Sequence, residues 1–267
     1  MLKTRLATAA VAIPALWLFI EYAPPWAFAG FITVVTAIGL SEYFAMALPD
    51  HPPERVAGIL FGLVVAAGVA TRDPHLWGAG MSLTVIGGLA FTIARHGDLE
   101  AAVQRLGLQL LGVVYVGFFM PHVILMRELP SGDGWRWLLF VIATVFGSDS
   151  GGYFAGRAFG RRKLLPQVSP KKTVEGAIGA VGGAVLAALL MHVLVHRGLA
   201  LHEVVPLAVV LSVLAQFGDL CESALKRAFG AKDSGWIIPG HGGILDRLDS
   251  LLFPFVFTYY YAAVVGR

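Results

Sequence analysis

The sequence has little charge and almost no cysteine. Asp, Glu, Lys and Arg make up 14% of its 267 residues, and Cys221 is the single cysteine. One cysteine excludes an internal disulfide, and we expect Cys221 to pack between helices as a small residue rather than to react. The sequence also lacks a long charged segment, a low-complexity tract and a linker rich in proline or serine. A single domain over residues 1–267 is therefore predicted.

Apolar residues dominate instead, at 57% of the chain. Runs long enough to cross a bilayer recur from one end to the other, separated by short turns that contain Pro, Gly and Asp. This pattern predicts an all-α, polytopic integral membrane protein with about nine transmembrane helices. The predicted spans are Leu6–Ile20, Pro25–Leu48, Val56–Ala70, His75–Ala94, Ala101–Met126, Trp137–Phe159, Val174–Leu194, Val204–Phe229 and Ile244–Val265. Close helix packing is predicted at five glycines: Gly152, Gly156, Gly160, Gly179 and Gly183.

Lys and Arg residues are distributed unevenly between the loops. If the N-terminus lies inside, the only ones of the 20 that fall outside are Arg72, Arg127, Arg136, Arg197 and Arg267. The positive-inside rule therefore predicts this orientation. It places two charged segments, residues 157–172 and 216–249, on the same cytoplasmic face.

The segment 216–249 concentrates charge between two apolar runs. A charged side chain at the centre of a membrane helix costs about 2.5 to 3.5 kcal/mol, so these carboxylates indicate a function. A polar stripe at helical steps of three and four consists of Asp219, Glu222, Ser223, Lys226 and Arg227. Asp246 and Asp249 are likewise three residues apart at the start of the last span.

Two carboxylate pairs on neighbouring helices suit a divalent cation. Mg²⁺ binds carboxylate oxygens together with substrate phosphates, and the two pairs meet at the cytoplasmic ends of their helices. The alternative is a set of ion pairs between helices, for example Asp219 or Glu222 with Arg247. Both interpretations stay open on these residues alone.

The connection between these helices favours a phosphate ligand. Pro239–Gly243 contains three glycines just before a helix N-terminus, and Lys232 and Arg247 flank it. Glycine lets backbone N–H groups approach an anion, and a helix N-terminus attracts negative charge. An ordinary turn between helices is the alternative for the glycines. Carboxylates, amides and bases together predict a site for a nucleotide with its metal.

The second charged segment repeats this chemistry. Asp149 lies late in the sixth span, and Lys171 and Lys172 precede the seventh. With Ser169 as cap and Pro170 in the first turn, a helix N-terminus and both lysines are expected to face one anion. The more exposed bases Arg161, Arg162 and Lys163 are expected to meet anionic lipid.

Three runs resemble a known family. The run Ser223–Asp249 resembles the signature of CDP-diacylglycerol synthases (phosphatidate cytidylyltransferases) at every fixed position. Ser169–Gly176 and Asp149–Tyr153 resemble further blocks of that family, the second more loosely. The likeness extends over about residues 146–249 and places the catalytic part within 146–250.

The resemblance implies that CTP and phosphatidic acid react to CDP-diacylglycerol and pyrophosphate. It implies Mg²⁺ as cofactor, with a second cation left open, a homodimer, and a place in the cytoplasmic membrane of a bacterium with the site on the cytoplasmic face. No nucleic acid is expected. Expected metal ligands are Asp219, Asp246 and Asp249, with Glu222 as a weaker ligand. Expected phosphate-binding or catalytic residues are Lys226, Arg227, Lys232, His241 and Arg247. Further substrate-binding residues are expected to be Asp149, Lys171, Lys172, Ser223, Gly242 and Gly243.

Two other functions stay open. A CTP-dependent polyprenol kinase would release CDP rather than pyrophosphate and would need a base for its hydroxyl acceptor. A transporter would also place carboxylates within the membrane, yet the charges cluster at one face and no inverted repeat is evident. Neither accounts for the full run Ser223–Asp249.

Two further features have plainer interpretations. Glu42, in the second span, is expected to hydrogen-bond to a neighbouring helix or to lie near the cytoplasmic boundary, with the lipid pocket as the alternative. His192 and His196 are four residues apart, but Glu203 is the only carboxylate nearby. No zinc site is expected there.

Overall fold

The computed structural model describes residues 14–94, 98–235 and 242–265. Residues 14–22 are helical. The elements that follow are α2 (Pro25–Ala47), α3 (Pro52–Ala70), α4 (Pro74–Ala94), α5 (Leu99–Gly112), the π-helix η1 (Val113–Phe118), α6 (His122–Arg127), α7 (Gly134–Phe159), β1 (Lys163–Leu165), β2 (Ser169–Thr173), α8 (Val174–Leu194), α9 (Leu201–Ala228) and α10 (Leu245–Val265). Apart from one short hairpin, regular structure in the described residues is helical.

The predicted membrane spans are confirmed wherever the structure describes them. Eight helical segments of the described chain are long and apolar enough to cross a bilayer, and each coincides with a predicted span to within a few residues. The segment Leu99–Arg127 combines α5, η1 and α6 into one such span. The first predicted span, Leu6–Ile20, falls mostly outside the described residues. The protein is therefore an integral membrane protein.

Local sequence determines where these helices begin. Pro25, Pro52 and Pro74 open α2, α3 and α4, at the position where the missing N–H of proline costs no hydrogen bond. Asp98 caps α5, and its Oδ1 accepts hydrogen bonds from the N–H groups of Glu100 and Ala101 at 3.0 and 3.4 Å.

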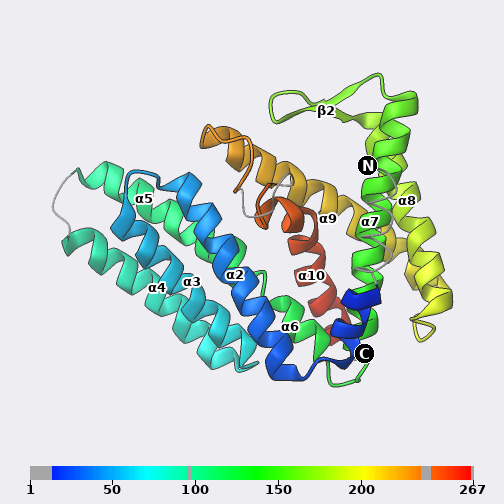
Figure 1. Cartoon of the computed structure of the whole chain (residues 1–267), viewed down its shortest axis with the longest axis horizontal. Helices are drawn as coiled ribbons and strands as arrows, with labels where there is room; N and C mark the ends of the chain where they lie inside the picture. Colours follow the sequence, from blue (N-terminus) through cyan, green and yellow to red (C-terminus); the bar gives the residue numbers. More distant parts are fainter. Residues whose placement is uncertain (1–13, 95–97, 236–241, 266–267) are drawn as a thin grey trace.

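The helices form two groups with the last two helices between them. Figure 1 shows α2, α3, α4 and α5 together on one side, α7 and α8 side by side on the other, and α9 and α10 between. Buried aromatic residues such as Tyr43, Phe44 and Trp137 fill the core. Because helix directions alternate along the chain, the C-terminal ends of α2, α7 and α9 lie at the same end of the bundle as the N-terminal ends of α8 and α10.

Glycines bring α7 and α8 into backbone contact, as predicted. A methyl group at Gly151 would collide with the carbonyl of Gly179, and one at Gly183 would collide with the carbonyl of Gly147. Gly152 also faces α8, because a methyl there would lie 3.3 Å from Ala180 Cβ. Small residues at this interface let the helices approach closely.

The prediction that Ser169 and Pro170 begin a helix is wrong. Ser169 and Pro170 do not open a helix but lie in β2, which pairs with β1 as an antiparallel hairpin. The cap of α8 is Thr173, whose hydroxyl accepts the Gly176 N–H at 3.1 Å. An extended residue precedes proline readily, and a threonine at the last strand position can cap the helix that follows. Lys171 and Lys172 therefore project from a strand rather than from a helix N-terminus.

Replacing Gly183 with alanine is expected to weaken the contact between α7 and α8. The added methyl meets the Gly147 carbonyl, so the helices must separate, and the free energy of unfolding should fall by about 1 to 3 kcal/mol. Thermal unfolding of the purified protein in detergent measures the effect. Gly182→Ala is the matched control, because a methyl at Gly182 meets nothing within 4 Å. Equal unfolding temperatures for the two variants would contradict the packing role.

Candidate functional site

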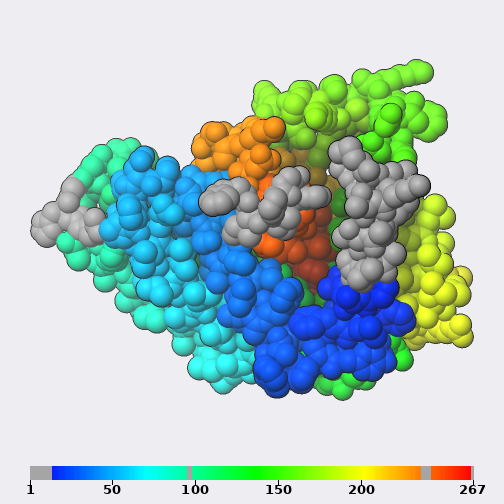
Figure 2. All heavy atoms as spheres, in the orientation of Figure 1, coloured from blue at the N-terminus to red at the C-terminus, as the bar shows by residue number. Residues whose placement is uncertain are grey.

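The predicted site residues that the structure describes gather at one end of the bundle. They come from the last part of α7, from β2, from the second half of α9, from the connection after it and from the start of α10. Figure 2 shows the β1–β2 hairpin overhanging this end of the molecule, close to the end of α9. Segments separated by about a hundred residues in the sequence therefore share one polar region.

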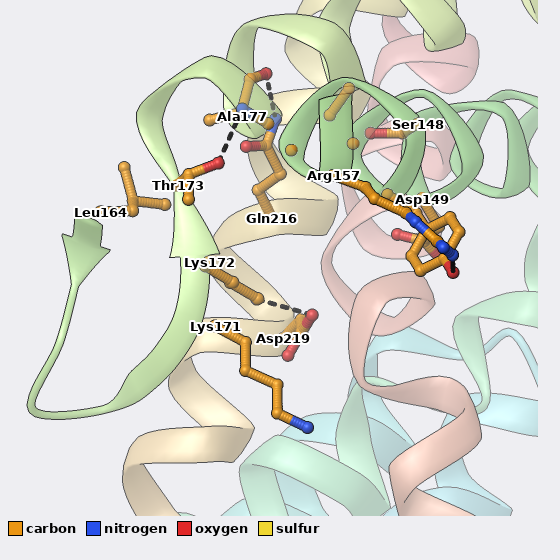
Figure 3. Close-up of a pocket in the computed structure, with 15 residues that line it drawn as sticks. Ser148, Asp149, Arg157, Leu164, Lys171, Lys172, Thr173, Ala177, Gln216 and Asp219 are labelled. Carbon is orange, nitrogen blue, oxygen red and sulfur yellow. Dashed lines mark hydrogen bonds and ion pairs between the residues drawn. The ribbon is translucent and has the colours of Figure 1, made fainter. Parts of the chain in front are cut away.

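A cavity of about 470 Å³ lies between α7, α8, β2 and α9. Its charged lining residues are Asp149, Arg157, Lys171, Lys172 and Asp219. Figure 3 shows Lys171 and Lys172 extending from β2, with Asp219 on α9 beside Lys172 and Asp149 on α7 across the cavity. Glycine and alanine residues of α7 and α8 make up much of the remaining wall. Cations from a surface hairpin and carboxylates from membrane helices thus face one space.

The carboxylates of this cavity are recessed among the helices. Asp149 precedes the end of α7 by ten residues and Asp219 precedes the end of α9 by nine, which places them about 14 to 15 Å along the helix axes from those ends. The Lys172 ammonium lies 2.6 Å from Asp219 Oδ2 and within electrostatic range of Asp149. Asp249 lies within electrostatic range of both Asp149 and Asp219. Lys172, Asp149, Asp219 and Asp249 form the first of two charged clusters.

The uncharged polar side chains of Ser148 and Gln216 also line the cavity, and the sequence reasoning gave them no role. The hydroxyls of Ser148 and Ser212 are 2.8 Å apart and both side chains are buried. Gln216 Nε2 donates to Ser212 Oγ at 3.2 Å and to the Ala177 carbonyl at 3.4 Å. Serine and glutamine within apolar spans were the available signal, because a bilayer offers such groups no partners.

A second charged cluster has Lys226 at its centre. Its ammonium contacts the carboxylates of both Glu222 and Asp246. The three side chains are 12%, 1% and 8% exposed. The sequence left metal binding and ion pairing open for α9, and the structure pairs Glu222 with Lys226 and Asp219 with Lys172. Pairing of this kind offsets the cost of taking charges out of water.

Asp246 also fixes the chain on both sides of residues 236–241. Its Oδ2 accepts hydrogen bonds of 2.8 Å from the Ser234 N–H, the Ser234 hydroxyl and the Gly243 N–H. Gly242 has a φ of 80°, a conformation that favours glycine. A methyl group at Gly242 would also collide with Asp246 Oδ2, so glycine at this position lets the backbone pass close to the carboxylate.

The remaining predicted residues lie around these two clusters. Ser223 donates to Asp219 Oδ1 at 3.3 Å, so it supports the first cluster. Arg227 and Lys232 are exposed at the end of α9 and beyond it, and Arg247 is exposed in the first turn of α10. His241 lies outside the described residues.

The carboxylates fit a cation that is completed by substrate oxygens. Within residues 14–94, 98–235 and 242–265, no three His, Cys, Asp or Glu side chains form a group that could hold a metal ion. Mg²⁺ commonly binds one or two protein carboxylates and takes its other ligands from phosphates and water. Asp219 and Asp249, with Asp149 nearby, provide oxygen donors of this kind.

Fold and site together define a polytopic membrane protein with a recessed, charged cavity suited to phosphate groups and a divalent cation. The model of the cytidylyltransferase family matches residues 3–265, and the chain belongs to this family. It is 31% identical over 260 residues to a phosphatidate cytidylyltransferase of Thermotoga maritima, covering 94% of this chain and 93% of that one. It is 40% identical over 161 residues to the Bacillus subtilis phosphatidate cytidylyltransferase, a match that spans 60% of either chain. The family resemblance seen in the sequence is confirmed.

Replacing Lys226 with methionine is expected to destabilise the protein strongly. The substitution keeps much of the side-chain volume but leaves Glu222 and Asp246 without their shared cation. Breaking a buried ion pair from one side costs about 3 kcal/mol or more, so the unfolding temperature in detergent should fall well below that of the parent protein. Arg227→Met is the control, since Arg227 is the exposed neighbour. Similar unfolding temperatures for both variants would show that Lys226 is not needed to neutralise this cluster.

Proposed function

We propose that this protein is a phosphatidate cytidylyltransferase that transfers CMP from CTP to phosphatidic acid and releases pyrophosphate. The observation that carries the proposal is the cavity in which Lys171 and Lys172, from a hairpin at the bundle end, face Asp219 and Asp149 recessed among membrane helices. A water-soluble triphosphate can enter such a cavity from the bundle end. A lipid phosphate can reach it from the bilayer while its acyl chains remain among lipids.

The reaction requires positioning and charge neutralisation more than proton transfer. A phosphate oxygen of the lipid attacks the α-phosphorus of CTP, and the bond from that phosphorus to the bridging oxygen of the pyrophosphate leaving group breaks. The lipid phosphate is already ionised near neutral pH, so the attack needs no general base. Holding two anionic groups in line, with cations around the transferring phosphorus, supplies most of the rate enhancement.

The two charged clusters take different parts in this proposal. Asp219 and Asp249 would hold Mg²⁺, with Asp149 beside them. Bound Mg²⁺ supplies neutralisation of phosphate charge and a template that aligns the reacting groups. Lys171 and Lys172 would bind phosphate oxygens next to this Mg²⁺, because the Lys172 ammonium lies against Asp219.

Glu222 and Asp246, the other expected ligands, already contact Lys226 and keep its ammonium at the edge of the acidic region. From there Lys226 can meet a phosphate. The exposed Arg227, Lys232 and Arg247 lie at the same bundle end and would attract the triphosphate.

The orientation in the membrane belongs to the same proposal. The site and most of the Lys and Arg residues lie at one end of the helices, and cytoplasmic loops carry an excess of these residues. We therefore place the site at the cytoplasmic face of a bacterial inner membrane, where CTP is present. A homodimer is part of the proposal on the strength of the family resemblance.

The purified protein with phosphatidic acid, Mg²⁺ and CTP labelled at the α-phosphate is expected to yield labelled lipid and free pyrophosphate. Asp219→Asn should lower kcat/KM by about 100-fold or more, because it weakens the site for the Mg²⁺ that would neutralise charge on the transferring phosphoryl group. Asp50→Asn is the matched control, since Asp50 is an exposed residue in a turn at the same bundle end. Thin-layer separation of lipids and a pyrophosphate assay measure the two products.

A second assay separates the kinase from the cytidylyltransferase. With CTP labelled at the γ-phosphate and a polyprenol as acceptor, labelled polyprenol and released CDP would identify a kinase. Absence of any labelled lipid from correctly folded protein would reject the cytidylyltransferase. Full activity of Asp219→Asn would keep the reaction and reject the role given to Asp219.

A further inference from the structure

Glu42 joins the first half of the chain to the site in the second half. It lies near the C-terminal end of α2 and is 5% exposed. Its Oε1 accepts the Ile244 N–H at 3.0 Å, and its Oε2 accepts the Leu245 N–H at 2.9 Å. The expected hydrogen bond to a neighbouring helix is present, and it reaches the start of α10 across about two hundred residues of sequence.

The carboxylate of Glu42 satisfies N–H groups that α10 cannot satisfy itself. The first N–H groups of a helix have no acceptor within the helix, and negative charge near them is favourable. Side chains provide acceptors for three successive groups: Glu42 for Ile244 and Leu245, and the Ser234 hydroxyl for Asp246 at 3.2 Å. Glu42 therefore caps α10 from another helix.

Two glycines of the signature run are shaped around the same carboxylate. A methyl group at Gly235 would collide with Glu42 Oε1, and a methyl group at Gly243 would meet Glu42 Oε2 and the Ser234 hydroxyl. These glycines stand on the two sides of residues 236–241. Glu42 thus contacts the chain both before and after this segment.

The contacts of Glu42 continue directly to Asp246 and Lys226. The Ser234 hydroxyl lies 2.8 Å from Asp246 Oδ2 and 3.4 Å from Glu42 Oε2, so it stands between the two carboxylates. Asp246 in turn contacts the Lys226 ammonium. A displacement of Glu42 would shift Ser234 and the first turn of α10, and with them the carboxylate that orients Lys226.

We propose that Glu42 is a positioning residue for the nucleotidyl transfer reaction. It acts through Ser234 and the start of α10 on Asp246 and Lys226 and does not touch the reacting groups itself. The inference rests on the proposed function, since it assigns Glu42 a part in that same site. It also gives a role to α2, which lies in the half of the chain that the family resemblance did not cover.

The test compares Glu42→Gln with Glu54→Gln, a second buried glutamate at the same bundle end that contacts Arg105. Glutamine keeps the size of the side chain but replaces one acceptor by a donor that faces an N–H group. We expect Glu42→Gln to lower kcat per folded molecule about 10- to 100-fold, as loss of a supporting partner does at metal sites. The Mg²⁺ concentration for half-maximal rate should rise, because a shift of the first turn of α10 also moves Asp249 on the same helix. KM for phosphatidic acid should not change. Glu54→Gln should lower stability without changing kcat per folded molecule.

Folded protein is quantified by size-exclusion chromatography and thermal unfolding, so that loss of protein is separated from loss of rate. Glu42→Asp, which keeps the charge and both acceptors on a shorter side chain, should recover part of the rate and serves if Glu42→Gln does not fold. Equal kcat per folded molecule in Glu42→Gln and Glu54→Gln would overturn the inference.

Wild-type protein in the same assay separates this inference from the proposed function. If wild type forms no labelled lipid, the proposed function fails, and the increase in unfolding temperature on adding CTP with Mg²⁺ decides the inference instead. An increase that is lost in Glu42→Gln and kept in Glu54→Gln supports the positioning role. An equal increase in both variants overturns it.

Discussion

The cost of placing charge among membrane helices governs this structure. Ionisable groups removed from water need an opposite charge or a set of hydrogen-bond donors, because the bilayer offers neither. Lys172 pairs with Asp219, Lys226 pairs with Glu222 and Asp246, and Glu42 accepts backbone N–H groups. Lys226 and Glu222 both lie on α9, but the other pairings join different elements. They hold β2 against α9, α10 against α9, and α10 against α2.

Close helix packing follows from the same requirement. The cavity lies between α7, α8 and α9, and its walls come close together because α7 and α8 pack in backbone contact. Glycines along the contact between α7 and α8 allow this close packing. At Gly218 a methyl group would collide with the Asp249 carbonyl, so α9 and α10 also approach closely beside the acidic groups. Glycines bring backbones together in this bundle, and the short distances between backbones let short Asp side chains from different helices act on one another.

The spans and most candidate site residues could be predicted because their signals are local. An apolar run has the length of a bilayer, and Asp219, Glu222 and Lys226 repeat at helical spacing. The hairpin before α8 could not be predicted in this way, since Ser169 and Pro170 suit either a helix start or a strand, and only pairing with β1 decides between them. Contacts between residues far apart in the sequence could not be predicted either. Nothing near Glu42 in the sequence identifies the backbone of α10 as its partner.

The three-residue spacing of Asp246 and Asp249 shows how one motif can provide two kinds of carboxylate. This spacing keeps both on about the same face of α10 but separates them along the axis by about 4.5 Å. Asp246, at the helix start, reaches the N–H groups of the preceding connection and Lys226, and its oxygens have protein partners. Asp249, one turn deeper, lies within electrostatic range of Asp149 and Asp219. Depth in the bundle therefore separates a carboxylate that organises the backbone from one that faces the acidic region where a cation would be stable.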